Sequence, residues 1–173
     1  MDLGEAVQVL RSIPIFSKLD PSKLKLLAFA SDHMTFDDGE VLFRQGEPAE
    51  SAYLIEEGEV LICAGEENNE LVVGTLGKND LFGEMAIFRK SPRVATIRAK
   101  GSVKVMQIEG DMFIRMVTEN PDTALGVMRM LSEKIARTTE RFEAFEEQAR
   151  SMQSVVDAAH PCAPTPVPGD GNR

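Results

Sequence analysis

The segment that decides the fold of this chain reads Leu81-Phe-Gly-Glu-Met-Ala-Ile-Phe-Arg-Lys-Ser-Pro-Arg-Val-Ala-Thr96. Gly83 lets a ligand approach the backbone closely, because glycine has no side chain in the way. Residues 84 to 88 can form a short helix that Pro92 stops. The first amides of a helix lack internal hydrogen-bond partners and favour negative charge, so the segment predicts an anion-binding turn.

Two charged residues narrow the identity of the anion. Arg93 lies where the chain leaves the turn, and its guanidinium can donate two parallel hydrogen bonds to an oxyanion. Glu84 would repel a phosphate, so we interpret it as an acceptor for hydroxyl groups such as those of a ribose. A phosphate and a ribose hydroxyl bound together describe a nucleotide. The alternative is a turn in which Arg93 and Glu84 only pair with each other at the surface.

The segment resembles the phosphate-binding cassette of the cyclic nucleotide-binding domain family. The family pattern is Phe-Gly-Glu-(Leu/Met)-Ala, followed several residues later by Pro-Arg-x-Ala-(Thr/Ser), and it is matched by Phe82, Gly83, Glu84, Met85, Ala86, Pro92, Arg93, Ala95 and Thr96. The resemblance extends over residues 10 to 157. It implies that Glu84 binds the ribose 2′-hydroxyl and that Arg93 binds the cyclic phosphate.

From this resemblance we predict a set of ligand-binding residues. They are Phe82, Gly83, Glu84, Met85, Ala86, Arg93, Val94, Ala95, Val73 and Phe142. Members of the family that favour guanine often carry threonine just after the arginine, where its hydroxyl can bond the base. Val94 has no hydroxyl, so we expect cAMP to be preferred over cGMP.

Short apolar runs separated by glycines follow Met34 and predict strands. The runs are 41–43, 52–55, 60–64, 71–73, 94–97 and 103–106, with tight acidic turns expected at 37–40 and 56–59. Strands at this spacing are typical of an antiparallel sandwich or small barrel. We predict a mainly β fold with helices: a jelly-roll-like antiparallel β-roll, interrupted by the cassette. Helices are expected at 4–11, 21–30, from about 110, and from 121 to about 157.

The chain divides into three expected parts. Residues 1–119 form the helical lead-in and the β-roll, residues 120–157 form a long hinge and dimerisation helix, and the Pro-rich tail at 158–173 is disordered. Apolar or small residues recur three and four apart along the helix, at Met128, Leu131, Ile135, Thr138, Phe142, Phe145, Ala149, Met152 and Val156. This heptad pattern favours a parallel homodimer beyond Ile135, whereas residues 125–131 favour packing on the β-roll. Phe142 and Phe145 are either dimer core or an aromatic cap on the nucleotide base.

Several functions are disfavoured by composition. The net charge of −9 argues against nucleic-acid binding, and two histidines are too few for a cupin-like metal enzyme. No nucleophile motif is present, so we expect neither an enzyme nor a cofactor. Each carboxylate can be assigned to a turn, a cap or a solvated helix face, and His33 to the surface or to packing. Cys63 and Cys162 fit a reducing, cytoplasmic setting, and no apolar run is long enough to span a membrane.

Two functions remain from different classes. The first is a cyclic nucleotide sensor whose C-terminal helix changes position on ligand binding, with an unidentified protein partner or a change in dimer geometry as its output. The second is a coiled-coil scaffold whose β-roll has lost its ligand. The presence of both Glu84 and Arg93 favours the sensor.

Overall fold

The computed structural model of the protein describes residues 3–65 and 69–159, with side chains described as far as Val155. The chain separates into two compact units, Met1–Met128 and Arg129–Arg173. The expected disordered tail falls outside the described residues from position 160 onward. Its first two positions, 158 and 159, belong to a helix.

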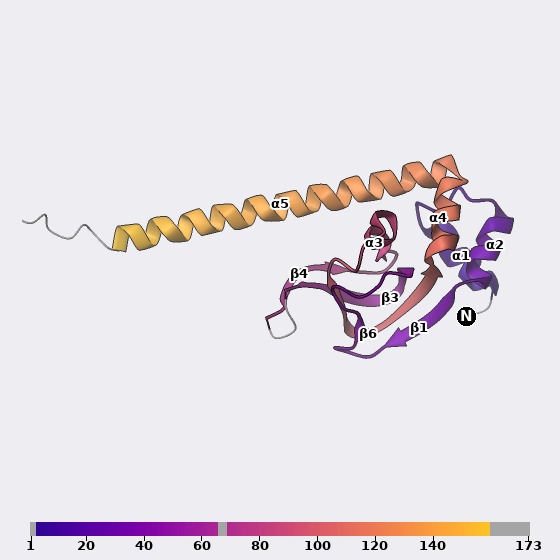
Figure 1. Ribbon diagram of the computed structural model, residues 1–173, viewed down its shortest axis with the longest axis horizontal. Coiled ribbons are helices and arrows are strands. Elements are labelled where there is room, and N and C mark those ends of the chain that lie inside the picture. The colour runs from indigo at the N-terminus through magenta and orange to yellow at the C-terminus, as the bar shows by residue number, and fades with distance from the viewer. Residues whose placement is uncertain (1–2, 66–68, 160–173) are drawn as a thin grey trace, which may run out of the picture. The chain divides into compact units, whose positions relative to one another are not determined.

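The first unit is an antiparallel β-roll with helices at one end (Figure 1). In chain order its elements are α1 (Leu3–Ser12), α2 (Pro21–Phe29), β1 (Asp32–Phe36), β2 (Val41–Phe43), β3 (Ser51–Ala64), β4 (Leu71–Leu76), β5 (Leu81–Phe82), α3 (Glu84–Arg89), β6 (Thr96–Glu109), α4 (Gly110–Thr118) and the start of α5 (Pro121–Ala159). The sheet runs β1-β6-β3-β4, while β2 pairs with β6 and β5 pairs with β3. Every pairing is antiparallel, which confirms the predicted fold class.

Two strands of 14 residues, β3 and β6, form most of the sheet. The sequence suggested a pair of short strands in place of each, divided by turns at Gly58 and Gly101, and this was wrong. Both glycines lie inside strands, with φ of +86° and +72°. The pairing of β3 with β6 shifts register around Glu57. A left-handed residue here makes a bulge that bends the ladder without reversing it.

The core of the β-roll is an apolar cluster between the strands. Its members are Phe43, Tyr53, Ile55, Val60, Phe82, Ile97, Ala99, Val103 and Val105. Three aromatic rings meet within it: the ring centres of Tyr53 and Phe82 are 5.3 Å apart, and Phe43 lies 5.6 Å and 6.0 Å from those two rings. Alternate residues of a strand face the same side, which directs this set inward. Phe82 is the second residue of the cassette, so the cassette is anchored in the core.

The second unit consists, in its described part, of the continuation of α5. Its largest apolar side chains are exposed: Ile135 (66%), Phe142 (61%), Phe145 (67%) and Met152 (67%). The side chain of Val156, the last predicted position of the heptad pattern, lies outside the described residues. Within residues 3–65 and 69–159, no helix is long and apolar enough to cross a membrane.

Candidate functional site

The backbone of Arg93 is held by the turn between β2 and β3. The Arg93 amide donates to the carbonyl of Glu47, and the Arg93 carbonyl accepts from the amide of Gly46, both at 2.8 Å. The hydroxyl oxygen of Thr96 accepts from the amide of Gln45 at 3.0 Å. These bonds fix the outgoing end of the cassette before any ligand is considered.

The guanidinium of Arg93 is buried, with 5% of the residue exposed. Its Nη1 donates to the carbonyl of Gly83 at 3.0 Å, and its Nη2 donates to the carbonyl of Ser51 at 2.8 Å. Burial lowers the pKa of Arg93 from its ordinary value, and the neighbouring groups, Tyr53 first among them, act in the opposite direction. Arginine nevertheless stays protonated in proteins, so the site keeps its positive charge.

Glu84 is the first residue of α3 and is 1% exposed. The bond from Arg93 to the carbonyl of Gly83 brings the guanidinium to the residue directly before Glu84. The two ends of the cassette therefore meet in the protein interior. The alternative of a surface turn carrying an Arg93–Glu84 pair is wrong, because both residues are buried.

Gly83 has a structural role that the sequence did not reveal. Its φ is +78°, and a Cβ atom at this position would lie 2.8 Å from Nη1 of Arg93. We expected the space beside Gly83 to admit a ligand, and the guanidinium takes part of it. The cassette helix runs one residue beyond the predicted 84–88: α3 ends at Arg89, and Lys90, with φ of +50°, ends it two residues before Pro92.

The other predicted site residues differ in their surroundings. Phe82 and Ala86 are buried, Met85 and Val94 are exposed, and Ala95 is half-buried. The structure thus gathers Phe82, Gly83, Glu84 and Arg93 at the start and end of the cassette. Val73 lies exposed on β4 and Phe142 lies in the second unit, so their assignment to a ligand stays a prediction.

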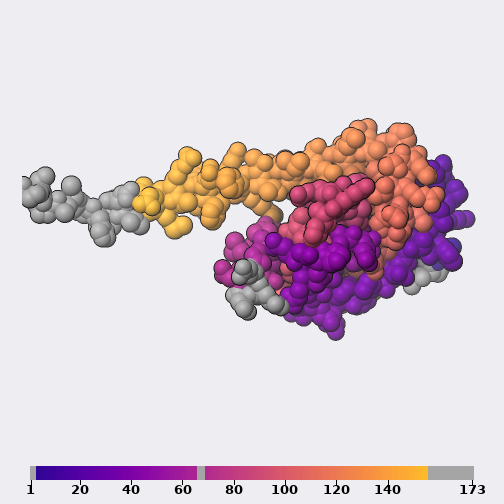
Figure 2. Space-filling view, in the orientation of Figure 1, coloured from indigo at the N-terminus to yellow at the C-terminus, as the bar shows by residue number. Residues whose placement is uncertain are grey.

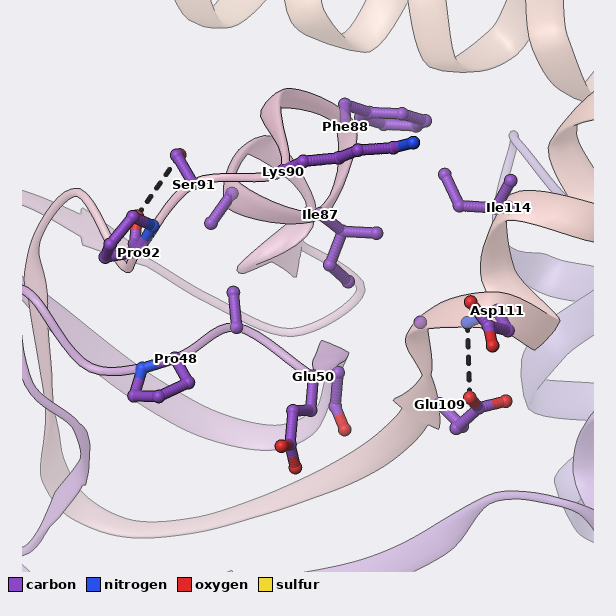
Figure 3. A pocket seen from close by; sticks show the side chains of 14 residues that line it. Pro48, Glu50, Ile87, Phe88, Lys90, Ser91, Pro92, Glu109, Asp111 and Ile114 are labelled. Carbon is purple, nitrogen blue, oxygen red and sulfur yellow. Dashed lines mark hydrogen bonds between the residues drawn. The ribbon is translucent and has the colours of Figure 1, made fainter.

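A cavity of about 870 Å³ adjoins the cassette (Figure 3). It is lined by residues from segments 48–51, 86–92 and 109–114, and of the predicted site residues it includes Ala86 alone. Phe88 and Lys90 line this cavity on the side of the cassette (Figure 3). The cassette reaches the surface of the first unit (Figure 2). Ser51 belongs to its lining and also accepts the bond from Arg93, so one residue joins this cavity to the predicted phosphate site.

Sequence reasoning missed two aromatic residues that contact Arg93. Its guanidinium carbon lies 4.1 Å from the ring centre of Phe43 and 5.6 Å from that of Tyr53. Both residues were read as ordinary strand residues. Burial raises the pKa of the Tyr53 hydroxyl, and Arg93 acts to lower it. No local motif marks this pair, because β2 and β3 approach Arg93 only in the folded chain.

A second buried acid also escaped the sequence analysis. Glu56 is 4% exposed, and its Oε2 lies 3.0 Å from Nδ1 of His33 on β1. The predicted tight acidic turn at 56–59 was wrong, because these residues belong to β3. Across the described part of the chain, no group of three or more His, Cys, Asp or Glu residues could hold a metal ion.

Comparison with known proteins shows the family to which the fold belongs. The model of the cyclic nucleotide-binding domain matches residues 33–120. The chain belongs to the cyclic nucleotide-binding domain family. The chain is also similar to the cAMP-dependent protein kinase regulatory subunit of Blastocladiella emersonii, with 37% identity over 109 residues. The matched region is 62% of this chain and 27% of that protein. Such relatives are regulatory subunits, in agreement with the expectation that this chain is not an enzyme.

Two solved structures of the family extend the comparison. The regulatory domain of Toxoplasma gondii PKA, crystallised with cAMP, has a TM-score of 0.66 at 28% identity and covers 78% of this chain and 50% of that chain. The regulatory subunit of a cAMP-independent protein kinase A from Trypanosoma brucei has a TM-score of 0.68 at 26% identity and covers 82% and 50%. The family therefore includes similar folds that differ in their relation to cAMP.

Proposed function

We propose that this chain is a sensor module that binds a cyclic mononucleotide, with the phosphate on Arg93 and the ribose 2′-hydroxyl on Glu84. The observation that carries the proposal is the burial of both charged side chains within one segment. A buried charge is costly unless charged or hydrogen-bonding groups compensate it. Arg93 donates to two neutral carbonyls and keeps its net positive charge, which an anionic phosphate would balance.

The nucleotide that we propose is cAMP in preference to cGMP. The B. emersonii relative is a cAMP-dependent kinase subunit, and the T. gondii domain was crystallised with cAMP. Val94 is exposed beside Arg93 and has no hydroxyl to bond guanine. These observations support cAMP as the ligand. The T. brucei relative belongs to a cAMP-independent kinase, so the choice of nucleotide needs a direct test.

Calorimetry on the purified chain with cAMP, cGMP and a cyclic dinucleotide tests this function. We expect cAMP to bind most tightly and the cyclic dinucleotide not to bind. Glu84→Gln should weaken the binding of cAMP, because an amide accepts a hydrogen bond from a hydroxyl less strongly than a carboxylate does. The same change at Glu119, which is exposed directly after α4, should leave affinity unchanged. No binding of any of the three nucleotides would exclude the proposed function.

The proposed output is a change in the position of α5 when nucleotide binds. Nucleotide would favour one of two helix arrangements over the other, as in any population shift. Hydrogen–deuterium exchange along α4 and α5 should differ between the free and cAMP-saturated protein. Unchanged exchange in both helices at saturation would exclude this output.

A second candidate function is interaction through α5. The exposure of Ile135, Phe142, Phe145 and Met152 supports a partner helix, and we propose a second copy of the chain as that partner. With Met128 at heptad position a, Arg141 and Glu146 occupy g and the following e, where a parallel pair would place opposite charges together.

A further inference from the structure

Two aromatic rings and two backbone carbonyls contact the guanidinium of Arg93. The rings of Phe43 and Tyr53 lie 4.1 Å and 5.6 Å from its central carbon. The carbonyls of Ser51 and Gly83 accept from its two terminal nitrogens. These contacts come from three separate parts of the chain, so the position of the guanidinium depends on the fold around it.

The contacts leave part of the donor edge available. A guanidinium has five N–H donors, and the two carbonyls use one on each terminal nitrogen. The Nε atom is buried, and no described residue accepts a hydrogen bond from it. The Phe43 ring holds the cation through its face and uses none of these donors. Phe43 can therefore fix the guanidinium without competing with an anion, whereas the Tyr53 hydroxyl also hydrogen-bonds Arg93.

We infer that Phe43 and Tyr53 are positioning residues that hold the Arg93 guanidinium in the orientation from which it binds an anion. This inference rests on the proposed function, because it assigns the two rings a role at the same site. Phe43 is the closer ring and carries the larger share.

The Tyr53 ring is itself fixed by the opposite strand. Gln107 on β6 pairs with Tyr53 across the sheet, and its Nε2 donates to the Tyr53 hydroxyl at 3.4 Å. The same Nε2 donates to Oγ of Ser51 at 2.9 Å, and the Ser51 carbonyl accepts from Arg93. One side chain thus supports both a ring and a residue that hold the guanidinium.

A double-mutant cycle separates positioning from core packing. Phe43→Leu keeps an apolar side chain but removes the ring, and we expect cAMP affinity to fall about 3-fold to 30-fold. In an Arg93→Ala background the same change should have almost no effect, because the group on which the ring acts is gone. Phe43→Tyr keeps the ring and should restore wild-type affinity. Phe36→Leu is the matched control, since Phe36 packs against the same core cluster, whereas the rings beside the Arg93 guanidinium are those of Phe43 and Tyr53.

A readout without nucleotide tests the placement itself. In the free protein, ring currents from Phe43 should shift the Arg93 Nε–H signal upfield in an NMR spectrum, and the shift should vanish in Phe43→Leu and persist in Phe36→Leu. No cAMP binding by the wild type, with this shift pattern intact, would exclude the proposed function and leave the positioning role standing. An unshifted signal in the wild type, or equal losses of affinity from Phe43→Leu with and without Arg93, would overturn the inference.

Discussion

In the cassette, Arg93 and Glu84 keep 5% and 1% of their surface exposed, whereas on α5 the apolar side chains of Ile135 and Met152 keep 66% and 67% exposed. Charged residues are usually outside and large apolar residues usually inside, so both regions depart from the rule in opposite directions. The proposed nucleotide would balance the buried charge, and the proposed second copy of the chain would cover the exposed apolar stripe. The two regions can therefore be disrupted separately.

The largest effect should come from charging the α5 stripe. Ile135→Glu with Met152→Glu should convert a homodimer into a monomer, because each apolar side chain buried in a dimer contributes about 1.5–3 kcal/mol. Light scattering over a range of concentrations measures this. The matched control is Ala136→Glu with Ser151→Glu, because each of these residues is next to a mutated one but lies outside the apolar a and d positions. A wild-type chain that is monomeric at high concentration would contradict the dimer.

The next effect should come from the cassette. Arg93→Ala should weaken the binding of cAMP by about 2–5 kcal/mol, or tens to thousands of fold, because it removes the arginine from the proposed buried pair of arginine and phosphate. Arg93→Lys should restore only part of the affinity, since an ammonium cannot donate from a planar fork. Equal calorimetric affinity of the wild type and Arg93→Ala would remove Arg93 from the site.

The comparison also separates what the sequence can predict from what it cannot. The cassette motif and the apolar periods predicted the β-roll and the long helix, whereas the roles of Arg93 and Glu84 stay predictions. The two predictions of the fold worked because each depends on residues close together in the chain. Gly58 and Gly101 misled the prediction, because a glycine with positive φ serves a turn or a bulge equally well, and pairing between distant strands decides which.

The surroundings of Arg93 depend on contacts that no local pattern encodes. Phe43 and Tyr53 precede Arg93 by 50 and 40 positions, and their apolar neighbours conceal them among ordinary strand residues. Glu56 was misplaced for the same reason, since its contact with His33 follows from the pairing of β1 and β3 with β6. The apolar stripe of α5 was easier to predict, because helical periodicity depends only on residues close together in the chain.

Phe142 offers an intermediate test, because it belongs to the exposed stripe and is either dimer core or an aromatic cap on the base. Stacking on a base is worth about 1–3 kcal/mol, so Phe142→Ala should lower cAMP affinity by that amount if the cap exists. The measurement belongs in the monomeric Ile135→Glu, Met152→Glu background, where dimer loss cannot interfere. Phe145→Ala is the companion variant. If the monomer binds cAMP like the wild type and Phe142→Ala changes nothing further, both rings serve the dimer alone.

The smallest effect concerns Tyr53, which is the one tyrosine in a chain without tryptophan. Burial raises the pKa of its hydroxyl above the ordinary value of 10.0, and Arg93 opposes this rise. The folded protein therefore holds a proton that the unfolded chain releases. The contribution of Tyr53 to the free energy of unfolding is complete below pH 10.0 and is lost as the pH rises through the folded value.

Near-ultraviolet titration of the phenolate reports this group without interference from any other chromophore of its kind. We expect a midpoint above 10.0 while circular dichroism shows the chain folded, and a still higher midpoint in Arg93→Ala, because the guanidinium that stabilises the phenolate is removed. A folded-state midpoint at or below 10.0 that does not rise in Arg93→Ala would mean that Tyr53 is solvated and not buried beside Arg93, and the burial of charge would then fail as the distinguishing feature of the cassette.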